Sequence, residues 1–548
     1  MKTKIFTLPG MLILLALSLN MWAQDLQDNT VIPYKTGNSL LYASDIIIDN
    51  QATQDQYDVN LSVAFNGWLY AAYVVNEGTS WGWKVWISKD DGSTWQLFYD
   101  NPIATDWSMV ALDLLVTGTT VSDLAVYVPR IYQNDVSGTS MLRVTKHDGN
   151  TGSLLSTPYN CSVSTSTQKF KDVAIASDYL YPAYGVSPFS IGMLYSKNQS
   201  TKDSIILLTS SDGGNTFNAG KVVTNTNGYA RNVSLAYGRC ATNYNGRYFA
   251  AWEERIVSSE DMGSIYTAHS DPFVYSDFTT KVQLDNLLSH STGYCRNPSI
   301  SCQFNDVDNG NGHLTEVVLF DRAYDGNPAT YNVVGVYNKD TPLAENWSIF
   351  GLEASLSHSD IQPDLNFDPG YNNFLATYCN LTDQKLRYLV QNQEMPDPYN
   401  WALIIDKYND NNNLINPYPK VEINPVYTQV AHVWNGQWLG GLRVATFDAE
   451  YSTVGTPPAS GTTSINFSVC PNPARDFVNF STGLPQKEKV KITLFSLVGQ
   501  TQKVVFDGES PMGTSVYRAD VSRYPAGTWL YEIRCGNEKV AGRLVIIR

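Results

Sequence analysis

The chain has 548 residues, of which 43% are hydrophobic and 16% charged, a composition that excludes a wholly disordered protein. A chain of this length exceeds one ordinary core, so we expect two or more folded units. The formal net charge of -15 excludes a nucleic-acid-binding role, because a phosphate backbone needs a basic face. The 34 Tyr and 13 Trp favour strands over helices, and the expected fold class is all-β.

The first 23 residues have the features of a secretory signal peptide. Lys2 and Lys4 form a short basic region, Leu8 to Leu19 form an apolar run, and Ala23 ends a plausible cleavage site. A membrane anchor is the alternative, but the run is too short to span a bilayer comfortably. Because no later segment is long and apolar enough, we expect no transmembrane segment in the mature chain.

Residues 24–454 contain a repeat of the form strand, turn, strand. Seven apolar positions recur every 53 to 65 residues, and we take them as equivalent. They are Leu61, Leu114, Ala174, Leu235, Ile300, Leu365 and Ile423. Such spacing predicts one four-stranded blade per unit in a β-propeller with six or seven blades. The stretch Ile32 to Ile48 is a candidate for the strand that closes the ring.

The most specific motif in the repeat region occurs twice, as SKDDGSTW at residues 88–95 and as SSDGGNTF at residues 210–217. Both copies fit the pattern Ser-x-Asp-x-Gly-x-Thr-aromatic, which is typical of a hairpin turn. The Asp accepts hydrogen bonds from the turn backbone, the Gly adopts a geometry that a β-carbon disfavours, and the aromatic ring packs between sheets. The residues concerned are Ser88, Asp90, Gly92, Thr94, Trp95, Ser210, Asp212, Gly214, Thr216 and Phe217.

These two copies resemble the Asp-boxes, or BNR repeats, of sialidase-like β-propellers. The resemblance implies a propeller fold with the motifs on its periphery, away from any substrate site. A sialidase also needs three arginines for the substrate carboxylate, a Tyr nucleophile polarised by Glu, and an Asp acid/base. Its first arginine comes before the first Asp-box, but here no arginine precedes Ser88. Arg130-Ile131-Tyr132 echoes the expected arginine motif, but it follows the box and lacks the proline.

The candidate site residues are Arg231, Arg296 and Glu253. Arg231 and Arg296 occupy equivalent positions in neighbouring repeats, where inner strands are expected to begin near the central channel. Two guanidinium groups there could converge on an anionic ligand, with Glu253 as a base or an arginine partner. The alternative, which we favour over catalysis, is a set of structural salt bridges between blades.

Two acidic loops are candidates for Ca²⁺ binding. The sequence NDVDNGNGH contains Asp306 and Asp308, and DKYNDNNN contains Asp406 and Asp410. Alternating oxygen ligands suit Ca²⁺, but neither loop ends in the bidentate Glu of a complete calcium loop. We therefore favour solvated turns and expect no cofactor.

Seven cysteines are present, without the spacing of a zinc site. Export makes disulfides possible, and Cys470 with Cys535 is one candidate pair.

The last part of the chain is expected to be a separate domain. Residues 455–464 read GTPPASGTTS, a composition typical of a linker, and residues 465–548 then show short alternating runs separated by turns. The runs are Phe477–Phe480, Val490–Phe495, Val504–Phe506 and Trp529–Ile533. They predict a small antiparallel β-sandwich.

This tail is similar to the type A C-terminal sorting domain of the type IX secretion system found in Bacteroidetes-type bacteria. The matching residues include Pro471, Asn472, Pro473, Gly499 and Gly527, in the family's order. The resemblance implies recognition by the type IX machinery, passage across the outer membrane, and then release or attachment to the cell surface. The alternative is an accessory sandwich that binds carbohydrate or stabilises the propeller.

Three functions remain open from the sequence. The first is an exported propeller that binds glycan or protein, which we favour because no complete catalytic set is visible. The second is a sialidase-like glycoside hydrolase using Arg231, Arg296 and Glu253. The third is a structural or adhesive protein of the cell envelope.

Overall fold

The computed structural model of the chain describes two compact units, one within residues 33–452 and one within residues 453–548. The described residues are 45–546 without 51, 77–80, 104, 119, 165–166, 179–189, 200–201, 241–242, 258–259, 272–274, 276, 289–291, 305–313, 328–330, 342–345, 352–358, 369–372, 383, 392–400, 408–416, 425–428, 439–441, 452–465, 471–473, 475–476, 485–486, 497–501, 512, 526 and 536–537. The expected signal peptide and linker lie outside these residues.

The described residues of the first unit form seven antiparallel sheets, here called blades 1 to 7 in chain order. From the inner strand outward, blade 1 consists of β2 (Gln56–Val63), β3 (Leu69–Asn76), β4 (Trp81–Ser88) and β5 (Gln96–Pro102), and blade 2 of β6 (Trp107–Leu112) with β7 (Leu115–Thr117), β8 (Ala125–Asn134), β9 (Ser140–Asp148) and β10 (Leu154–Val163). Blade 3 consists of β11 (Phe170–Ser177), β12 (Ile191–Gln199), β13 (Lys202–Ser210) and β14 (Lys221–Asn225).

The remaining blades repeat this order. Blade 4 consists of β15 (Tyr229–Cys240), β16 (Asn243–Arg255), β17 (Ser264–His269) and β18 (Val282–Gln283), and blade 5 of β19 (Cys295–Cys302), β20 (Leu314–Ala323), β21 (Tyr331–Thr341) and β22 (Ser348–Gly351). Blade 6 consists of β23 (Asp360–Asp368), β24 (Asn373–Asn380), β25 (Lys385–Gln391) and β26 (Trp401–Lys407), and blade 7 of β27 (Lys420–Asn424), β28 (Gln429–Trp438), β29 (Leu442–Tyr451) and β1 (Ile46–Ile47). Two short 3-10 helices, η1 (Asp285–Leu287) and η2 (Tyr324–Gly326), lie in blades 4 and 5.

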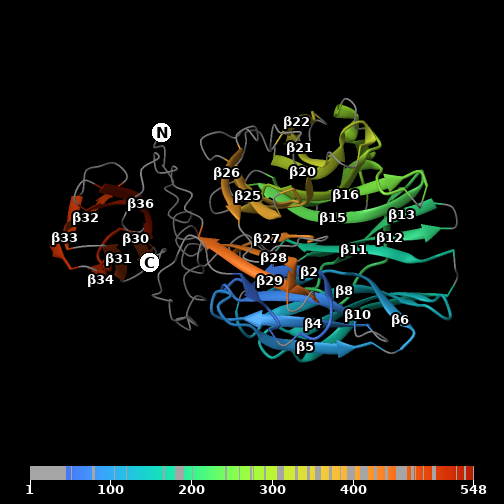
Figure 1. Cartoon of the computed structure of the whole chain (residues 1–548), viewed down its shortest axis with the longest axis horizontal. Helices are drawn as coiled ribbons and strands as arrows, with labels where there is room; N and C mark the ends of the chain where they lie inside the picture. The colour runs from blue at the N-terminus through green and yellow to red at the C-terminus, as the bar shows by residue number, and fades with distance from the viewer. Residues whose placement is uncertain are drawn as a thin grey trace, which may run out of the picture. The chain divides into compact units, whose positions relative to one another are not determined.

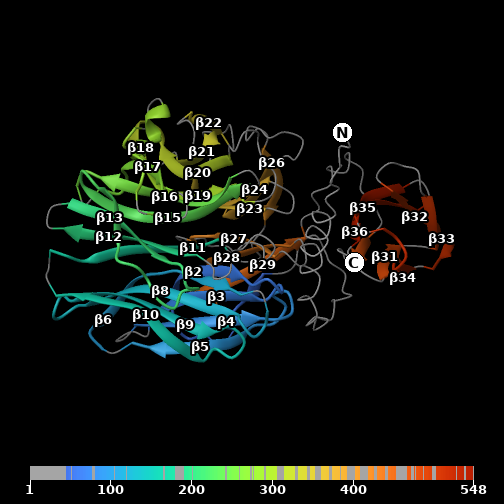
Figure 2. The same ribbon diagram turned by 180° about the vertical axis from the view of Figure 1, so that it is seen from behind.

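The inner strands of successive blades contact one another in chain order, and β27 of blade 7 contacts β2 of blade 1. The unit is therefore a closed β-propeller, and the structure decides for seven blades where the sequence left six or seven open. Inner strands such as β2, β11, β15 and β27 lie near the middle in both views, with outer strands such as β5 and β22 at the periphery (Figures 1 and 2). The seven positions taken as equivalent in the sequence all fall in the inner-strand region of their blades.

Burial is high in the second strands and low in the outer ones, as blade 1 shows. The second strand β3, LYAAYVVN, is buried at seven consecutive residues because neighbouring blades cover both of its faces. The outer strand β5 has no buried residue. Large side chains fill the space between the sheets, among them Trp83, Trp252 and Trp434, each at most 1% exposed.

The ring is closed by the N-terminal strand. In β1, Ile46 lies opposite Phe447 and Ile47 opposite Thr446 of β29, so the start of the chain completes the last blade. The backbone N–H of Ile48 also donates to the carbonyl oxygen of Ala445 at 3.0 Å, and the Ile48 side chain is buried. This agrees with the expectation that a strand within Ile32 to Ile48 closes the ring.

The second unit is a sandwich of two sheets with its own core. One sheet has the order β30 (Asn466–Cys470), β31 (Phe477–Leu484), β34 (Gly513–Asp520), and the other β33 (Gln502–Ser510), β32 (Glu488–Ser496), β35 (Gly527–Cys535), β36 (Glu538–Ile546). Alternate residues of facing strands, such as Val478, Phe480, Ile492, Leu494 and Ile533, meet in the core. The four runs predicted from the sequence all lie within these strands.

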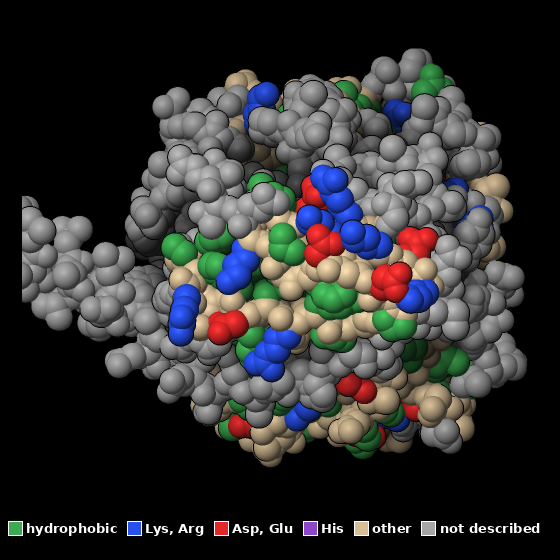
Figure 3. Space-filling view, turned by 90° about the vertical axis from the view of Figure 1, so that its left-hand side faces the viewer, with side chains coloured by type: hydrophobic (Ala, Val, Ile, Leu, Met, Phe, Trp, Pro, Cys, Tyr) green, Lys and Arg blue, Asp and Glu red, His purple; other side chains and the backbone are tan. Residues whose placement is uncertain are grey.

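Charged side chains of the sandwich are mainly exposed and paired. On β32 and β33, Lys491 lies 3.0 Å and Lys489 3.6 Å from the carboxylate of Asp507. Basic and acidic side chains are interspersed on the face of the molecule that Figure 3 shows. Such exposed pairs contribute little stability, so the core holds this unit together. The side chain of Cys470 lies outside the described residues, and its bridge to Cys535 stays a prediction.

The closing strand generates a stability prediction. We expect Ile48→Pro to destabilise the propeller by about 1–3 kcal/mol, because it removes the N–H that pairs with Ala445 and leaves that carbonyl unsatisfied. Ile48→Val keeps the N–H and should cost only about 0.5–1.5 kcal/mol. Urea unfolding followed by tryptophan fluorescence measures both variants. Equal midpoints for the two would show that this hydrogen bond does not contribute to closure.

Candidate functional site

All seven inner strands begin on the same face of the propeller, here called the start face. Near that face the inner strands of blades 1, 4, 5 and 6 contain a β-bulge, where their register with the second strand shifts. One residue in each bulge has a positive φ, namely Asp58 (51°), Asn232 (50°), Asn297 (52°) and Gln362 (55°). Asp and Asn tolerate this backbone region better than most residues do. The bulges turn the side chains around them toward neighbouring blades.

Carboxylates near the ring centre connect one inner strand to the next. Asp113 of blade 2 accepts a hydrogen bond from the backbone N–H of Ile175 in blade 3, at 2.8 Å. Asp172 of blade 3 accepts one from Val233 in blade 4, also at 2.8 Å. Asp58 bonds Leu112 at 3.0 Å and Asp364 bonds Val421 at 2.9 Å in the same way. These acids satisfy N–H groups on strand edges that lack a neighbouring strand.

Serine and asparagine side chains complete the circle. Ser234 accepts from the N–H of Ile300 and Ser299 from that of Leu365, each at 3.1 Å. At the junction of blades 7 and 1 the direction reverses, and Asn424 donates to the carbonyl of Gly67 at 3.0 Å. A polar side chain therefore bridges each of the seven junctions.

Burial shifts the titration of two acids near the ring centre, Asp113 and Asp172. It raises the pKa of Asp113 to about 6 and that of Asp172 to about 7, even though each accepts two backbone N–H groups. Lys420 of blade 7 lies among these carboxylates, 3.5 Å from Asp364. Asp364, and more weakly Asp113 and Asp58, raise the pKa of Lys420. Because these three acids belong to blades 6, 2 and 1, the ammonium group of Lys420 interacts electrostatically with three other blades.

A second set of carboxylates recurs in blades 3, 4 and 5, and each member is completely buried: Asp203, Glu253 and Asp321. Asp203 binds the ammonium group of Lys171 at 2.8 Å and accepts the N–H of Ala230 in blade 4 at 2.7 Å. Asp321 binds the Arg296 guanidinium at 2.8 Å and accepts the N–H of Gln362 in blade 6 at 3.3 Å. Each acid thus holds a basic side chain and the start of the next blade.

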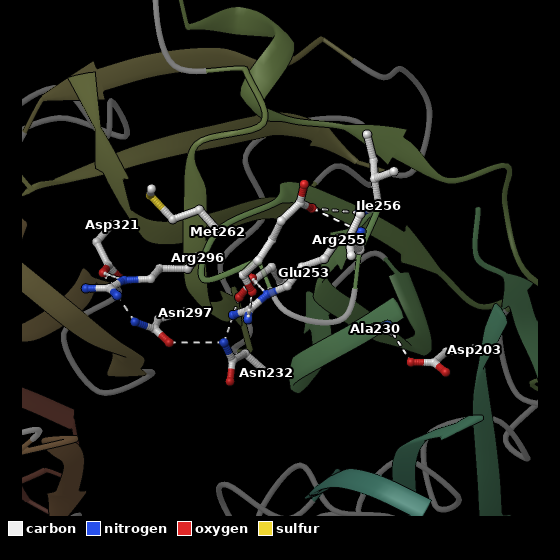
Figure 4. Close-up of polar contacts among 12 residues, drawn as sticks. Asp203, Ala230, Asn232, Glu253, Arg255, Ile256, Met262, Arg296, Asn297 and Asp321 are labelled. Atoms are coloured by element: carbon white, nitrogen blue, oxygen red, sulfur yellow. Dashed lines mark hydrogen bonds and ion pairs between the residues drawn. The ribbon is translucent and has the colours of Figure 1, made fainter. Parts of the chain in front are cut away.

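Glu253 is the corresponding acid of blade 4, and Figure 4 shows the network around it. It pairs with Arg255, accepts from Asn232 Nδ2 at 2.7 Å, and hydrogen-bonds the backbone of Asn297 in blade 5. Burial raises the pKa of Glu253, which these hydrogen bonds partly offset. Asn232 also donates to Asn297 Oδ1 at 3.1 Å, and Asn297 Nδ2 donates to Asp321 at 3.2 Å. The network therefore runs from Glu253 to the Arg296–Asp321 pair.

The structure places the three candidates from the sequence close together on blades 4 and 5. Arg231 is opposite Glu253 in the register of β15 with β16, and Arg296 is opposite Asp321 in that of β19 with β20. The Arg231 side chain is exposed, whereas 22% of the Arg296 side chain is exposed and its guanidinium lies over the Tyr331 ring at 4.0 Å. The two arginines thus present basic groups, while Glu253 lies beneath the surface.

The two hairpin motifs lie at the opposite face, between the third and fourth strands of blades 1 and 3. In the first, Thr94 donates to Asp90 through its N–H at 2.8 Å and its hydroxyl at 2.7 Å, and Gly92 N–H donates to Ser88 at 2.8 Å. Ser210, Asp212, Gly214 and Thr216 repeat these bonds in the second. Trp95 packs on Phe447 of blade 7, and Phe217 on Tyr159 of blade 2.

Arg130, part of the arginine motif echo, lies inside the fold. It is 1% exposed, donates to the carbonyl of Val128 and the hydroxyl of Thr145, and stacks over Trp83 of blade 1 at 4.5 Å. These contacts give Arg130 a packing role between blades 1 and 2.

No group of His, Cys, Asp and Glu side chains suited to a metal ion occurs among the residues that the structure describes. Asp306, Asp308 and Asp410 lie outside them, and so do Pro471, Asn472, Pro473 and Gly499 of the sorting motif. Within the described ranges, no helix has the length and hydropathy to span a membrane.

Sequence reasoning missed several polar residues of the start face. Lys171 directly precedes Asp172, as Arg231 precedes Asn232 and Arg296 precedes Asn297. This shared sequence pattern, a basic residue followed by Asp or Asn, could have identified Lys171 as a third basic residue. The acids Asp58, Asp113 and Asp364 had no such signal, because they lie two, six and four residues after the first residues of β2, β6 and β23, which is not a constant spacing.

The fold and its C-terminal sandwich define the chain as a β-propeller with an appended small β-domain. Residues 468–547 match the family described as the secretion system C-terminal sorting domain. The sandwich is thus a type IX sorting domain, and the chain is secreted across the outer membrane, to the cell surface or into the medium, by the type IX machinery. No curated protein matches the chain in sequence.

Several solved structures resemble the chain distantly. The α-L-arabinofuranosidase of Fusarium graminearum is 11% identical, with 75% of this chain and 98% of that one covered at a TM-score of 0.43. The polysaccharide lyase Uly1 is 9% identical, with coverage of 75% and 97% and a TM-score of 0.41. Trypanosoma rangeli sialidase is 10% identical, with coverage of 91% and 86% and a TM-score of 0.34. At these values none of them assigns a substrate to this chain.

The acids at the ring centre predict a pH dependence of stability. Burial, and then Asp364, raise the pKa of Glu422 to about 8, and its Oε2 accepts from Asn366 at 2.9 Å. The folded state therefore holds this proton more tightly than the unfolded chain does, so stability falls as pH rises from about 5 to about 8. Glu422→Gln keeps an acceptor for Asn366 and removes the titration. We expect a smaller fall of the melting temperature over this range for Glu422→Gln, measured by calorimetry; parallel curves would contradict the assignment.

The sorting domain predicts an export phenotype. Deletion of residues 465–548 should leave the propeller in the periplasm, because the signal that the type IX machinery recognises is then absent. Cell fractionation and immunoblotting of the producing bacterium, with the full-length chain as control, measure the distribution. Unchanged surface display or release would contradict the role of this domain.

Proposed function

We propose that the mature chain is an exported binding protein whose propeller holds an acidic glycan on the start face, with Arg231 and Arg296 as the main contacts. The observation that carries the proposal is the equivalent position of these two arginines in neighbouring blades 4 and 5, each next to the ring of inner strands. Planar guanidinium groups match carboxylate and sulfate oxygens and donate several hydrogen bonds at once.

Arg296 is held in a fixed orientation for such a contact. Its Nε donates to Asp321 at 2.8 Å, and its guanidinium covers the ring of Tyr331. A guanidinium has five N–H donors, so the contact with Asp321 leaves others for a ligand. Because Asp321 and Tyr331 hold the side chain from behind, binding requires little further ordering. Tyr418, 45% exposed, adds an aromatic surface near Arg296 and Asp321.

The contacts of the buried acids support binding over hydrolysis. A general acid or base needs an oxygen within hydrogen-bond reach of the substrate. Glu253 is completely buried and occupied by Arg255, Asn232 and the backbone of Asn297, and Asp321 is occupied by Arg296, Asn297 and Gln362. These contacts support a scaffold role for both acids. Sialidase-like hydrolysis and an adhesive envelope role are the alternatives that the test separates.

The test compares the wild-type mature chain with Arg231→Met on an array of acidic glycans and their neutral counterparts. We expect selective binding of acidic glycans, and about tenfold weaker binding by Arg231→Met, the value of one charge-assisted hydrogen-bond contact. Arg296→Lys keeps a partner for Asp321 but loses the planar fork, so it should also weaken binding. Isothermal titration with the best glycan measures each affinity.

The control variant is Lys221→Met, an exposed lysine on the outer strand β14, which should bind like the wild type. Binding of the wild-type chain to a protein that carries no glycan would favour a protein ligand. Release of the fluorophore from a fluorogenic sialoside would favour the hydrolase. Failure of the wild type to bind any array glycan would overturn the proposal.

A further inference from the structure

We propose that Lys171 forms a third basic subsite beside Arg231 and Arg296, so that blades 3, 4 and 5 hold an extended glycan chain with repeated acidic groups. This inference rests on the proposed function and deepens it, from a contact at one place to an arc of three contacts. The three residues are here called the basic arc.

The members of the basic arc lie near the starts of the inner strands of three consecutive blades. Lys171 lies on β11, Arg231 on β15 and Arg296 on β19, which are the inner strands of blades 3, 4 and 5. Arg231 and Arg296 directly precede the register shift of their inner strands, whereas Lys171 lies at the register shift of β11 itself. Because the starts of the inner strands lie on the same side of a propeller, the three residues follow the ring of inner strands on the start face.

Lys171, like Arg296, is held by a buried acid, although Asp203 lies on the third strand of its blade and Asp321 on the second. Its ammonium group bonds both oxygens of Asp203, at 3.0 and 2.8 Å, as Arg296 bonds Asp321. Both acids are completely buried, and both accept a backbone N–H from the next blade. Asp203 also accepts from Asn198 Nδ2 at 2.9 Å. The acid is thus fixed independently of Lys171, and it in turn fixes the ammonium group.

An aromatic ring supports each of these two cations. Lys171 lies over the ring of Tyr229 at 4.8 Å, and Arg296 over that of Tyr331 at 4.0 Å. Such contacts stabilise the cation and restrict the motion of a long side chain. Even so, 24% of the Lys171 side chain and 22% of that of Arg296 stay exposed. Both basic groups are therefore held in place and partly neutralised by a buried acid, and part of each side chain stays accessible to a ligand.

This arrangement selects the chemistry of the ligand. A single terminal acidic sugar can occupy one blade position, whereas three positions in a row favour an oligomer with an acidic group on several of its residues. The net charge of -15 opposes a polyanion at long range, but physiological salt screens charges beyond roughly 8 Å. Direct contact with the arc then decides binding, and affinity should depend on both chain length and salt.

The experiment measures affinities by isothermal titration for oligogalacturonates of one to eight residues, their methyl esters, and sulfated cello-oligosaccharides of the same lengths. For the wild type we expect affinity to rise with length for the acidic oligomers, and much weaker binding of the esters. Lys171→Met should bind the longest acidic oligomer about tenfold more weakly and the monomer unchanged. The comparison of carboxylated with sulfated oligomers identifies the preferred acidic group.

Two variants control for folding and for general charge. Lys171→Arg keeps the cation and should restore most of the affinity, whereas Lys221→Met removes an equal charge elsewhere and should have no effect. Melting temperatures confirm that each variant is folded. If the wild type binds acidic oligomers but Lys171→Met matches Lys221→Met, or affinity does not rise with length, the third subsite is refuted while the proposed function stands. If no acidic oligomer binds, both are refuted.

Discussion

The propeller depends on one constraint, the hydrogen bonding of the inner edge of each blade. An inner strand has a partner on one side, so the backbone N–H groups of its other edge need acceptors from elsewhere. Asp58, Asp113, Asp172 and Asp364 supply these acceptors from the preceding blade. An unsatisfied buried N–H costs about 1–3 kcal/mol, so the six junctions at which a side chain accepts such an N–H contribute an amount comparable with the net stability of a domain.

The same constraint connects the architecture to the candidate site. In blades 3 to 5 the junction acids Asp203, Glu253 and Asp321 each bind a basic side chain as well as the next blade. Burial of an acid is unfavourable unless a cation or several donors compensate it. In blades 3 and 5 the compensating cation is Lys171 or Arg296, near the start of the inner strand, whereas in blade 4 it is Arg255, at the end of β16. The proposed ligand contacts of Lys171 and Arg296 thus involve side chains that also compensate the buried acids at these junctions.

The sequence predicted the parts of the structure that depend on local pattern. Leu61, Ala174 and Ile423 mark their inner strands because short alternating runs define a strand, and the motif around Asp90 defines its turn within eight residues. The sequence did not predict which residues meet across the ring. Lys171 pairs with Asp203, which lies 32 positions further along the chain. Lys420 interacts with Asp58 and Asp113, which lie near the beginning of the propeller sequence. Such pairs follow from ring closure, which no local pattern contains.

The ring centre also shows why a shifted pKa alone is a poor guide to catalysis in this fold. Asp172 has a pKa of about 7, a value suited to a general acid at neutral pH. Yet its Oδ1 accepts the N–H of Val173 at 2.9 Å and its Oδ2 that of Val233 at 2.8 Å, so both oxygens face the backbone. The shift therefore arises from burial at a junction between blades. Lys171 and Arg296 differ from Asp172, because each is paired with a buried acid while part of its side chain is exposed, which agrees with the proposed binding role.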